Sequence, residues 1–283
     1  TMKELYYSKE EIDLLYKRNK LQVTDCNLSQ NEYLLLKSDF NSALVKYIDN
    51  TFILVKEPKS LQGIVPKDSK QKCFTDSLFD KNVLMSVALG KAGTGKTLLS
   101  ICYALYAYFK HDKKIVLIKP SVFVGGRSSV MGILPGDVND KMSGLMSSYM
   151  VHIKSILGRN AEHYLYEMLE KELLIYLPVE LARGMSLEDA TVIFDECQNA
   201  DIHTMKTIVS RVASSSKLIC LGDLGQIDAP FKKNESGLSI FIESDSFKES
   251  THTSQITLTS QYRSILADLC ESITEEYYNS IKD

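Results

Sequence analysis

The fold is decided by one stretch, Gly90-Lys91-Ala92-Gly93-Thr94-Gly95-Lys96-Thr97, which fits the pattern G-x-x-x-x-G-K-[ST] at every fixed position. An apolar run over residues 83–89 precedes it, and the pattern predicts a helix over 95–109. A strand, a glycine-rich turn and a helix in this order are the context that a phosphate-binding loop requires. The alternative is a glycine-rich turn with an incidental lysine, and the flanking elements disfavour it.

The residues of this loop have distinct expected roles. Glycines let backbone N–H groups turn inward around phosphate oxygens, and the N-terminus of the following helix adds partial positive charge. Lys96 is expected to contact the β- and γ-phosphates of ATP, and Thr97 to ligate Mg²⁺. The residues expected to surround the nucleotide here are Gly90, Ala92, Gly93, Thr94, Gly95, Lys96 and Thr97.

A pair of acids follows a second apolar run. The run covers residues 191–194 and ends in Asp195-Glu196. Asp195 is expected to hold Mg²⁺ through its water shell, and Glu196 to act as general base on the attacking water. Taken alone, the pair could be a solvated strand end. Downstream of a phosphate loop, the functional interpretation is strongly favoured.

A third apolar run, residues 218–221, ends in the polar turn Gly222-Asp223-Leu224-Gly225-Gln226. A neutral amide at this place can sense a γ-phosphate or hold a water without adding charge to an anionic site. Gln226 is the candidate for that role. A purely structural turn is the alternative, and the two preceding motifs make it the weaker one.

The remaining pattern predicts an α/β fold. Helical stretches separate short apolar runs at 115–118, 173–176, 192–194, 218–221 and 256–258. Such runs, bounded by polar turns, predict a mainly parallel sheet with helices on both faces. Binding sites in such sheets lie at the carboxyl ends of the strands, where the motifs above fall.

The first 61 residues have a different organisation. Ser8-Lys9-Glu10-Glu11 matches a capping box that opens a short helix to about Arg18. Strands are expected over 32–37 and 51–56, and residues 58–69 resemble a linker. We therefore expect a small N-terminal appendage at 1–61 and the nucleotide-binding domain at 62–283.

Composition limits the classes of function. A net charge of −3 over 283 residues argues against coating duplex DNA by bulk charge, although a local basic channel is compatible with it. The 6 cysteines are scattered without a C-x-x-C pair, so reduced thiols in the cytoplasm are expected and a zinc site is not. No apolar run approaches the ~20 residues of a membrane helix, so no membrane partner is expected.

Together, the motifs resemble the PhoH-like ATPases, relatives of superfamily 1 helicases. Five blocks occur in family order across about residues 62–280: 89–97, 132–137, 183–187, 195–199 and 222–228. The resemblance implies a RecA-type P-loop core with strand order 5-1-4-3-2 and one added strand near 173–176. It also implies Mg²⁺-dependent ATP hydrolysis coupled to work on single-stranded RNA or DNA, as a translocase or helicase.

The departures from the family pattern are modest. Cys197 stands where the family usually has Ala, and Lys119 where Arg is usual. The resemblance is closest to members that carry a PIN nuclease domain ahead of the ATPase. Residues 1–61 are too few for that nuclease, so its RNase activity is not expected of them.

The resemblance adds candidates around the base and the γ-phosphate. Gln71 resembles the adenine-reading glutamine of helicase relatives, with an exposed helical glutamine as the alternative. Gln261-Tyr262-Arg263-Ser264 resembles a helicase motif whose Tyr stacks near adenine and whose Arg reaches the γ-phosphate. A helix is expected after it, to about residue 279.

Arg263 is thus a candidate arginine finger, acting in its own subunit or in a neighbour's. It could instead cap a carbonyl or pair with an acid. Arg183 and Arg211 are weaker candidates for the same task. One core is expected where monomeric helicases have two, so the family suggests a homo-oligomer, with a hexameric ring as one form, that supplies the missing surface.

The region 119–141 is long, rich in glycine and contains Arg127. In helicase relatives the equivalent loop touches the nucleic-acid backbone, and cations there would position phosphates. A large structural loop is an equally supported interpretation. An ATP-dependent switch acting on a protein partner is the main alternative function, whereas a small-molecule kinase has no use for Glu196 beside the metal-binding acid.

Overall fold

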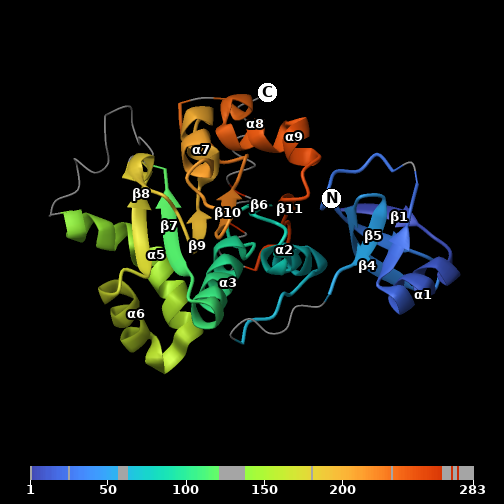
Figure 1. Ribbon diagram of the computed structural model, residues 1–283, viewed down its shortest axis with the longest axis horizontal. Helices are drawn as coiled ribbons and strands as arrows, with labels where there is room; N and C mark the ends of the chain where they lie inside the picture. Colours follow the sequence, from blue (N-terminus) through green and yellow to red (C-terminus); the bar gives the residue numbers. More distant parts are fainter. Residues whose placement is uncertain are drawn as a thin grey trace.

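The computed structural model describes residues 2–24, 26–56, 63–120, 138–179, 181–230, 232–262, 269 and 273. These residues form two β-sheets, the first with one described helix and the second with several (Figure 1). The first lies in residues 2–56, which we call the N-terminal lobe. The second lies in the described residues from 63 to 262, which we call the core. The boundary expected near residue 62 falls at positions 57–62, outside the described residues.

The core sheet has six strands, all parallel, in the order β11-β6-β10-β9-β7-β8. Counted from β6, this order is 5-1-4-3-2 with β8 added at the edge, which confirms the order that the family resemblance implies. The strands are β6 (Met85–Leu89), β7 (Lys114–Lys119), β8 (Leu174–Pro178), β9 (Ala190–Phe194), β10 (Lys217–Gly222) and β11 (Thr253–Thr257).

Both faces of this sheet are buried under helices (Figure 1). Helices α2 (Ser69–Phe79), α3 (Lys96–His111), α5 (Val138–Leu157) and α6 (Ala161–Glu170) cover one face. Helices α7 (Ile202–Val209), α8 (Gly237–Glu243) and α9 (Asp245–Lys248) cover the other. In β9, Ile193 packs in the first cluster, and Val192 and Phe194 pack in the second. Burial on both sides is why the core strands read as continuous apolar runs.

Short 3₁₀ turns connect several of these elements: η1 (Gly158–Asn160), η2 (Leu181–Gly184), η3 (Cys197–Asn199) and η4 (Lys233–Glu235). The strand register aligns the carboxyl ends of neighbouring strands. Gly222 of β10 pairs with Leu89 of β6, and Cys220 pairs with Phe194 of β9. The three motif-bearing turns therefore start from one edge of the sheet.

The N-terminal lobe contains a five-stranded sheet in the order β1-β3-β4-β5-β2. Its elements are β1 (Lys3–Tyr6), α1 (Lys9–Arg18), β2 (Lys20–Gln22), β3 (Tyr33–Lys37), β4 (Ser42–Ile48) and β5 (Thr51–Leu54). The expected capping box of α1 is confirmed, since Ser8 and Glu11 each accept the other's backbone N–H.

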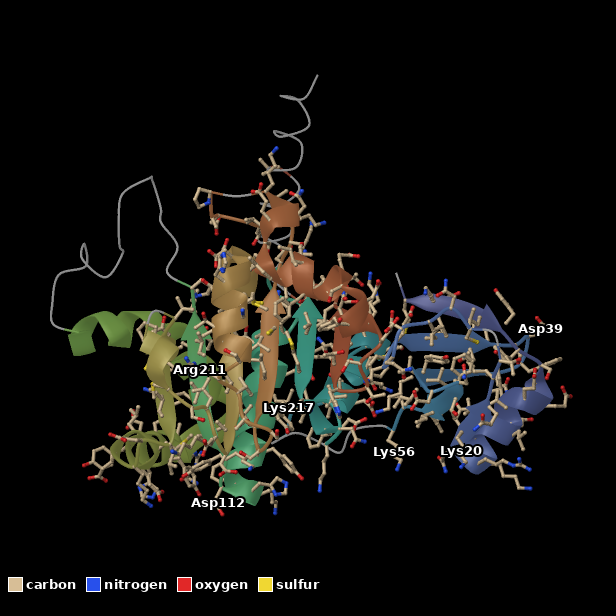
Figure 2. All side chains as sticks on the ribbon, turned by 45° about the horizontal axis from the view of Figure 1, so that its top comes forward. Lys20, Asp39, Lys56, Asp112, Arg211 and Lys217 are labelled. Carbon is tan, nitrogen blue, oxygen red and sulfur yellow. The ribbon has the colours of Figure 1, made fainter. Side chains whose placement is uncertain are left out.

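Strands β1, β2 and β4 were not predicted from the sequence. The strand β4 contains Lys46, whose charge interrupts the apolar pattern of the strand. Lys46 is nevertheless buried, at 7% exposed, where the lobe meets the core. Figure 2 places Lys20 and Asp39 on the lobe and Lys217 at the start of β10 in the core. Among the described helices, none combines the length and the apolarity needed to cross a membrane. The five cysteines in the described part are free thiols.

Candidate functional site

A cavity of about 410 Å³ opens at the carboxyl edge of the core sheet. It brings together most of the residues that the sequence singled out. Members from the phosphate loop, the acid pair and the turn after β10 all contribute to its wall: Ala92, Gly93, Gly95, Lys96, Thr97, Asp195, Glu196 and Gln226, together with Gln71 and Tyr262.

The phosphate loop requires glycine for two separate reasons. Gly90, Gly93 and Gly95 have φ of 146°, 82° and 92°, in a region that side chains rarely adopt. In addition, a Cβ on Gly90 would lie 2.3 Å from the carbonyl oxygen of Leu258. A Cβ on Gly95 would lie 2.9 Å from Nε2 of Gln71. At Gly90 the backbone of Leu258 leaves no room for a side chain, and at Gly95 a side chain would displace the Gln71 amide.

Lys96 begins helix α3 and lines the cavity. Its ammonium group donates hydrogen bonds to the carbonyl oxygens of Gly90 and of Lys91, the latter at 3.0 Å. The hydroxyl of Thr94 donates to the same Lys91 carbonyl at 3.0 Å, and Thr94 is 1% exposed. The loop is therefore braced internally, and the Lys96 ammonium is held against it by these carbonyls.

Asp195 follows β9 and is held from two sides. Its backbone N–H donates to the carbonyl of Ile118 at 2.9 Å. Its carboxylate accepts a hydrogen bond from the hydroxyl of Tyr149 on α5 at 3.0 Å. Burial raises the pKa of Asp195, and the neighbouring carboxylate of Glu196 acts in the same direction. A nearby cation would therefore stabilise the ionised form of the Asp195 carboxylate.

Glu196 has a left-handed backbone with φ of 53°. Such a conformation costs a non-glycine residue about 1–2 kcal/mol. Strain of this kind persists only where surrounding contacts fix it, and it is typical of functional sites. Here it turns the Glu196 side chain into the cavity beside Asp195.

Gln198 is a site residue that was not predicted from the sequence, although it lies in the Asp195–Asn199 block. Its side chain is fully buried. Its Nε2 donates to Oε2 of Glu196 at 2.7 Å and to the carbonyl of Gln226 at 3.0 Å. Its Oε1 accepts from the backbone N–H of Asp223 at 3.1 Å. One amide thus joins the expected general base to the turn after β10.

The turn after β10 is shaped by further polar contacts. Oδ1 of Asn199 accepts from the N–H groups of Asp228 and Ala229, at 2.8 and 3.2 Å. Gln226 lines the cavity with an exposed side chain. Asp223, also on the cavity wall, has a buried Oδ2 with no hydrogen-bond partner in the described part of the chain. The only sequence signal for Asn199 and Asp223 was their place in the motif blocks.

Gln71 is 5% exposed, so the alternative of an exposed helical glutamine is wrong. Its Nε2 donates to the carbonyl of Thr94 in the phosphate loop at 2.9 Å. Its Oε1 accepts from the N–H of Lys67 at 2.8 Å. Helix α2 therefore holds the phosphate loop directly through this side chain.

Tyr262 lies against the same loop. Its N–H donates to the carbonyl of Gly93 at 3.0 Å, and its hydroxyl donates to Asp68 at 2.7 Å. The ammonium of Lys67 is 4.6 Å from the centroid of its ring. Three sequence candidates are outside the described residues: Arg263, Arg127 and the side chain of Arg183. Arg211 is exposed just after α7 and does not line this cavity.

The donor set fits Mg²⁺ that arrives with a nucleotide. Thr97 and Asp195 offer a hydroxyl and a carboxylate to one cavity. No cluster of three or more His, Cys, Asp or Glu side chains able to hold a metal occurs in the described ranges. Mg²⁺ commonly uses one or two protein oxygens and completes its shell with water and phosphate oxygens. Asp195 and Thr97 suit that mode of binding.

Comparison with known proteins places these features in a family context. A family model described as "PhoH-like protein" matches residues 63–278. Protein PhoH2 of Bacillus subtilis (strain 168) is 29% identical over 289 residues, covering 96% of this chain and 63% of that protein. A PhoH-like protein of the same organism is 37% identical over 153 residues, covering 54% of this chain and 46% of its own length.

The chain thus spans less than two thirds of the length of these curated relatives. Among solved structures, a Pif1 helicase from Bacteroides in complex with ADP-AlF3 and ssDNA is 17% identical, with a TM-score of 0.34. The match covers 71% of this chain and 44% of that one.

Proposed function

The chain belongs to the PhoH-like protein family, and from that premise we propose that it hydrolyses ATP with Mg²⁺ and couples hydrolysis to single-stranded RNA or DNA. One observation carries the proposal. A single cavity gathers the phosphate loop, the Asp195-Glu196 pair and Gln226, which come from three separate strands. These are the groups that phosphoryl transfer to water needs.

Each side chain has a definite task in this proposal. Lys96 pairs with the β- and γ-phosphates, and Thr97 and Asp195 hold Mg²⁺. When bound, the metal neutralises charge on the phosphate oxygens. Glu196 accepts a proton from the attacking water as that oxygen bonds to the γ-phosphorus and the bond to the bridging oxygen breaks. Gln198 holds the Glu196 carboxylate in place through its hydrogen bond, and Gln226 orients the attacking water.

Gln71 and Tyr262 are proposed to recognise the adenine base, which favours ATP over GTP. Both line the cavity and both touch the phosphate loop. A glutamine amide has two donor hydrogens and two acceptor lone pairs, so its bonds to Thr94 and Lys67 use half of that capacity. A purine edge can engage the other half.

We also propose that the protein works as a homo-oligomer, in which Arg263 supplies an arginine finger. The hydrogen bond from Tyr262 N–H to Gly93 supports the role of Arg263, because it holds the residue before Arg263 at the phosphate loop. The coupling to nucleic acid and the ring both rest on family membership.

The decisive experiment measures ATP hydrolysis at several Mg²⁺ concentrations, with and without single-stranded RNA and DNA, alongside the mass of the protein in solution. We expect Mg²⁺-dependent turnover that single strands stimulate, and loss of turnover in Lys96→Ala. Turnover that no nucleic acid alters would favour an ATP-dependent switch on a protein partner. Turnover that survives Lys96→Ala would remove the central claim.

A further inference from the structure

The N-terminal lobe grips the C-terminal end of α2 through buried polar groups. The hydroxyl of Tyr33 on β3 donates to Asp76 at 2.9 Å. The ammonium of Lys46 on β4 pairs with Asp76 at 3.1 Å and also with Asp80. Burial and the Asp76 carboxylate both raise the pKa of Tyr33, so its hydroxyl stays protonated as a donor.

The core grips the same end of α2 from the other side. The ammonium of Lys217, on β10, donates to the carbonyls of Ser77, Leu78 and Asp80, at 2.7, 2.7 and 2.9 Å. These carbonyls lie at the end of the helix, where backbone acceptors lack helical partners. The end of α2 is therefore fixed between the lobe and the core sheet.

The lobe also holds the segment that leads into β11. The side-chain Nδ2 of Asn31 donates to the carbonyls of Thr251 and Thr253, at 2.8 and 2.9 Å. The backbone N–H of Gln30 donates to the carbonyl of Lys248 at 2.7 Å. Asn31 is 1% exposed, so this contact is buried as well.

The other ends of these two elements meet at the phosphate loop. Helix α2 has 11 residues, about 16 Å in length, and carries Gln71 near its start. There Gln71 bonds to Thr94. After β11, Leu258 donates to Leu89, and Tyr262 donates to Gly93. The two elements that the lobe holds are thus the two that brace the phosphate loop from outside.

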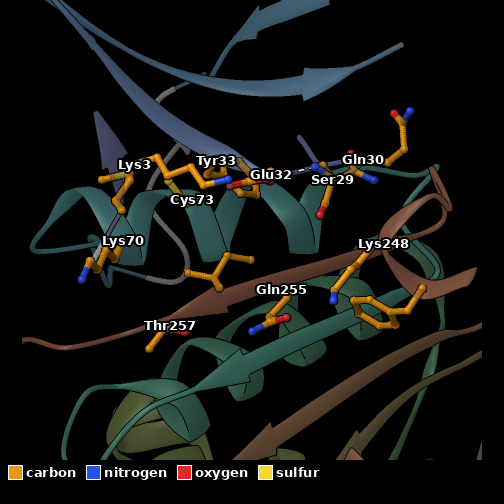
Figure 3. Close-up of a pocket in the computed structure, with 14 residues that line it drawn as sticks. Lys3, Ser29, Gln30, Glu32, Tyr33, Lys70, Cys73, Lys248, Gln255 and Thr257 are labelled. Atoms are coloured by element: carbon orange, nitrogen blue, oxygen red, sulfur yellow. Dashed lines mark hydrogen bonds and ion pairs between the residues drawn. The ribbon is translucent and has the colours of Figure 1, made fainter. Parts of the chain in front are cut away.

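A cleft of about 380 Å³ runs between the lobe and the core, next to these contacts. Figure 3 shows Tyr33 and Glu32 of the lobe on one wall and Gln255 and Thr257 of β11 on the other, with Cys73 of α2 between them. Part of this boundary is therefore open space. The lobe is attached through specific polar contacts as well as through apolar packing by residues such as Leu44 and Val55.

We propose that the N-terminal lobe is a positioning element that sets nucleotide affinity, acting through α2 and β11 on the phosphate loop. This inference rests on the proposed nucleotide-binding function. While the lobe is docked, Gln71 and Tyr262 hold the loop in its binding shape. When the contacts with the lobe are lost, α2 and β11 are no longer fixed at the ends far from the phosphate loop, and nucleotide binds more weakly. By linkage, bound nucleotide strengthens the docking of the lobe to the same degree.

Buried ions favour this interpretation over simple packing. Side chains of Lys46, Asp76 and Asp80 are only 8–14% exposed, and burying such a group is often no more stabilising than apolar residues of equal volume. An ion pair of this kind fixes one relative orientation, because each charge must meet its partner. Orientation of α2 is what the bond from Gln71 to Thr94 depends on.

Two variants of the 283-residue chain test the proposal. Tyr33→Phe removes the hydroxyl that binds Asp76, and Asn31→Asp turns a donor to two carbonyls into a repelling acceptor. We expect Kd for an adenosine triphosphate analogue with Mg²⁺ to rise about five- to tenfold in each, at the low end of the range of about 5- to 150-fold that is typical of allosteric coupling. The matched control is Tyr47→Phe, since the hydroxyl of Tyr47 bonds to Asn50, which also lies in the lobe.

A double-mutant cycle separates coupling from general damage. In a Gln71→Leu background, where the brace is already lost, Tyr33→Phe should weaken nucleotide binding by a smaller factor than in the unmodified protein. If Tyr33→Phe weakens nucleotide binding by the same factor in both backgrounds, the lobe does not act on the phosphate loop through α2. Unmodified protein that binds no nucleotide would instead refute the proposed function, which is a distinct result.

Hydrogen exchange tests the reciprocal effect without measuring activity. The amide of Gln30 bonds to the core, whereas the amide of Val23 bonds to Asn50 within the lobe. Saturating nucleotide should slow exchange at Gln30 several-fold and leave Val23 unchanged. If nucleotide binds and Gln30 exchanges at an unaltered rate, and if Kd is unaltered in Tyr33→Phe and Asn31→Asp, the lobe does not position the phosphate loop.

Discussion

Gln198 donates a 2.7 Å hydrogen bond to the carboxylate of Glu196, only two residues before it in the chain. Glu196 has a left-handed backbone, with φ of 53°, at the start of the turn that contains Gln198. The same amide of Gln198 also bonds to the turn after β10, at Gln226 and Asp223. A change in that turn therefore has a direct path to the orientation of the Glu196 carboxylate.

Gln198→Leu should lower kcat for ATP hydrolysis by about 10²-fold, since small misplacement of a catalytic group has effects of that size. Leucine has a similar volume, so the buried position stays filled, but Glu196 loses its donor. Steady-state kinetics should show a fall in kcat with a smaller change in KM. Unchanged kcat would show that Glu196 is oriented by other contacts.

Glu196→Gln should bind ATP and hydrolyse it slowly, because general-base catalysis contributes ~10²–10⁴-fold in rate. A neutral amide of the same shape keeps the fold and the contact with Gln198. Single-turnover hydrolysis and binding of a fluorescent ATP analogue check the two parts separately. A variant with normal turnover would show that another group activates the water.

Tyr149→Phe should raise the Mg²⁺ concentration needed for tight nucleotide binding by about tenfold or more, as loss of a partner to a metal-binding side chain commonly does. The hydroxyl of Tyr149 holds Oδ2 of Asp195, and phenylalanine leaves that oxygen buried without a donor. Binding of a fluorescent nucleotide, titrated with Mg²⁺, measures the effect apart from turnover. Tyr166→Phe is the control, because Tyr166 is 68% exposed on α6.

Gly237→Ala should lower the free energy of unfolding by about 1–3 kcal/mol, the usual cost of overpacking. A Cβ at Gly237 would lie 2.5 Å from the carbonyl oxygen of Asp201 and 2.5 Å from Cγ of Met205. Gly184→Ala, where a Cβ meets nothing within 4 Å, should change stability by less than about 0.5 kcal/mol. Denaturant unfolding of both variants provides the comparison, and equal stabilities would contradict the close packing at Gly237.

Arg263→Ala should keep ATP binding and lose most hydrolysis, since arginine fingers contribute ~10³–10⁵-fold in rate. Mixing this variant with Lys96→Ala determines which subunit the finger serves. Regained activity in mixed oligomers indicates action on the neighbour, and no regained activity indicates action within one subunit. Full activity of Arg263→Ala alone would exclude both arrangements.

Much of the fold and the centre of the site were predictable from sequence, because the signals are local. Residues 90–97 specify their own turn through glycine spacing, and the core strands identify themselves by continuous apolar runs. Strand β4 was missed because its Lys46 is buried against acids more than 25 residues away in the chain. A charge in a strand indicates exposure unless its partner is known.

The sequence by itself determined the phosphate loop, the acid pair and the order of the strands through the family resemblance. Only the tertiary structure decided that Tyr149 holds Asp195, that Gln71 braces Thr94 and that the lobe grips α2. The physical reason is the separation of the contacting residues along the sequence. A motif encodes the conformation of neighbouring residues, whereas these contacts join residues 23 to 46 positions apart. Their geometry depends on how whole helices pack on the sheet.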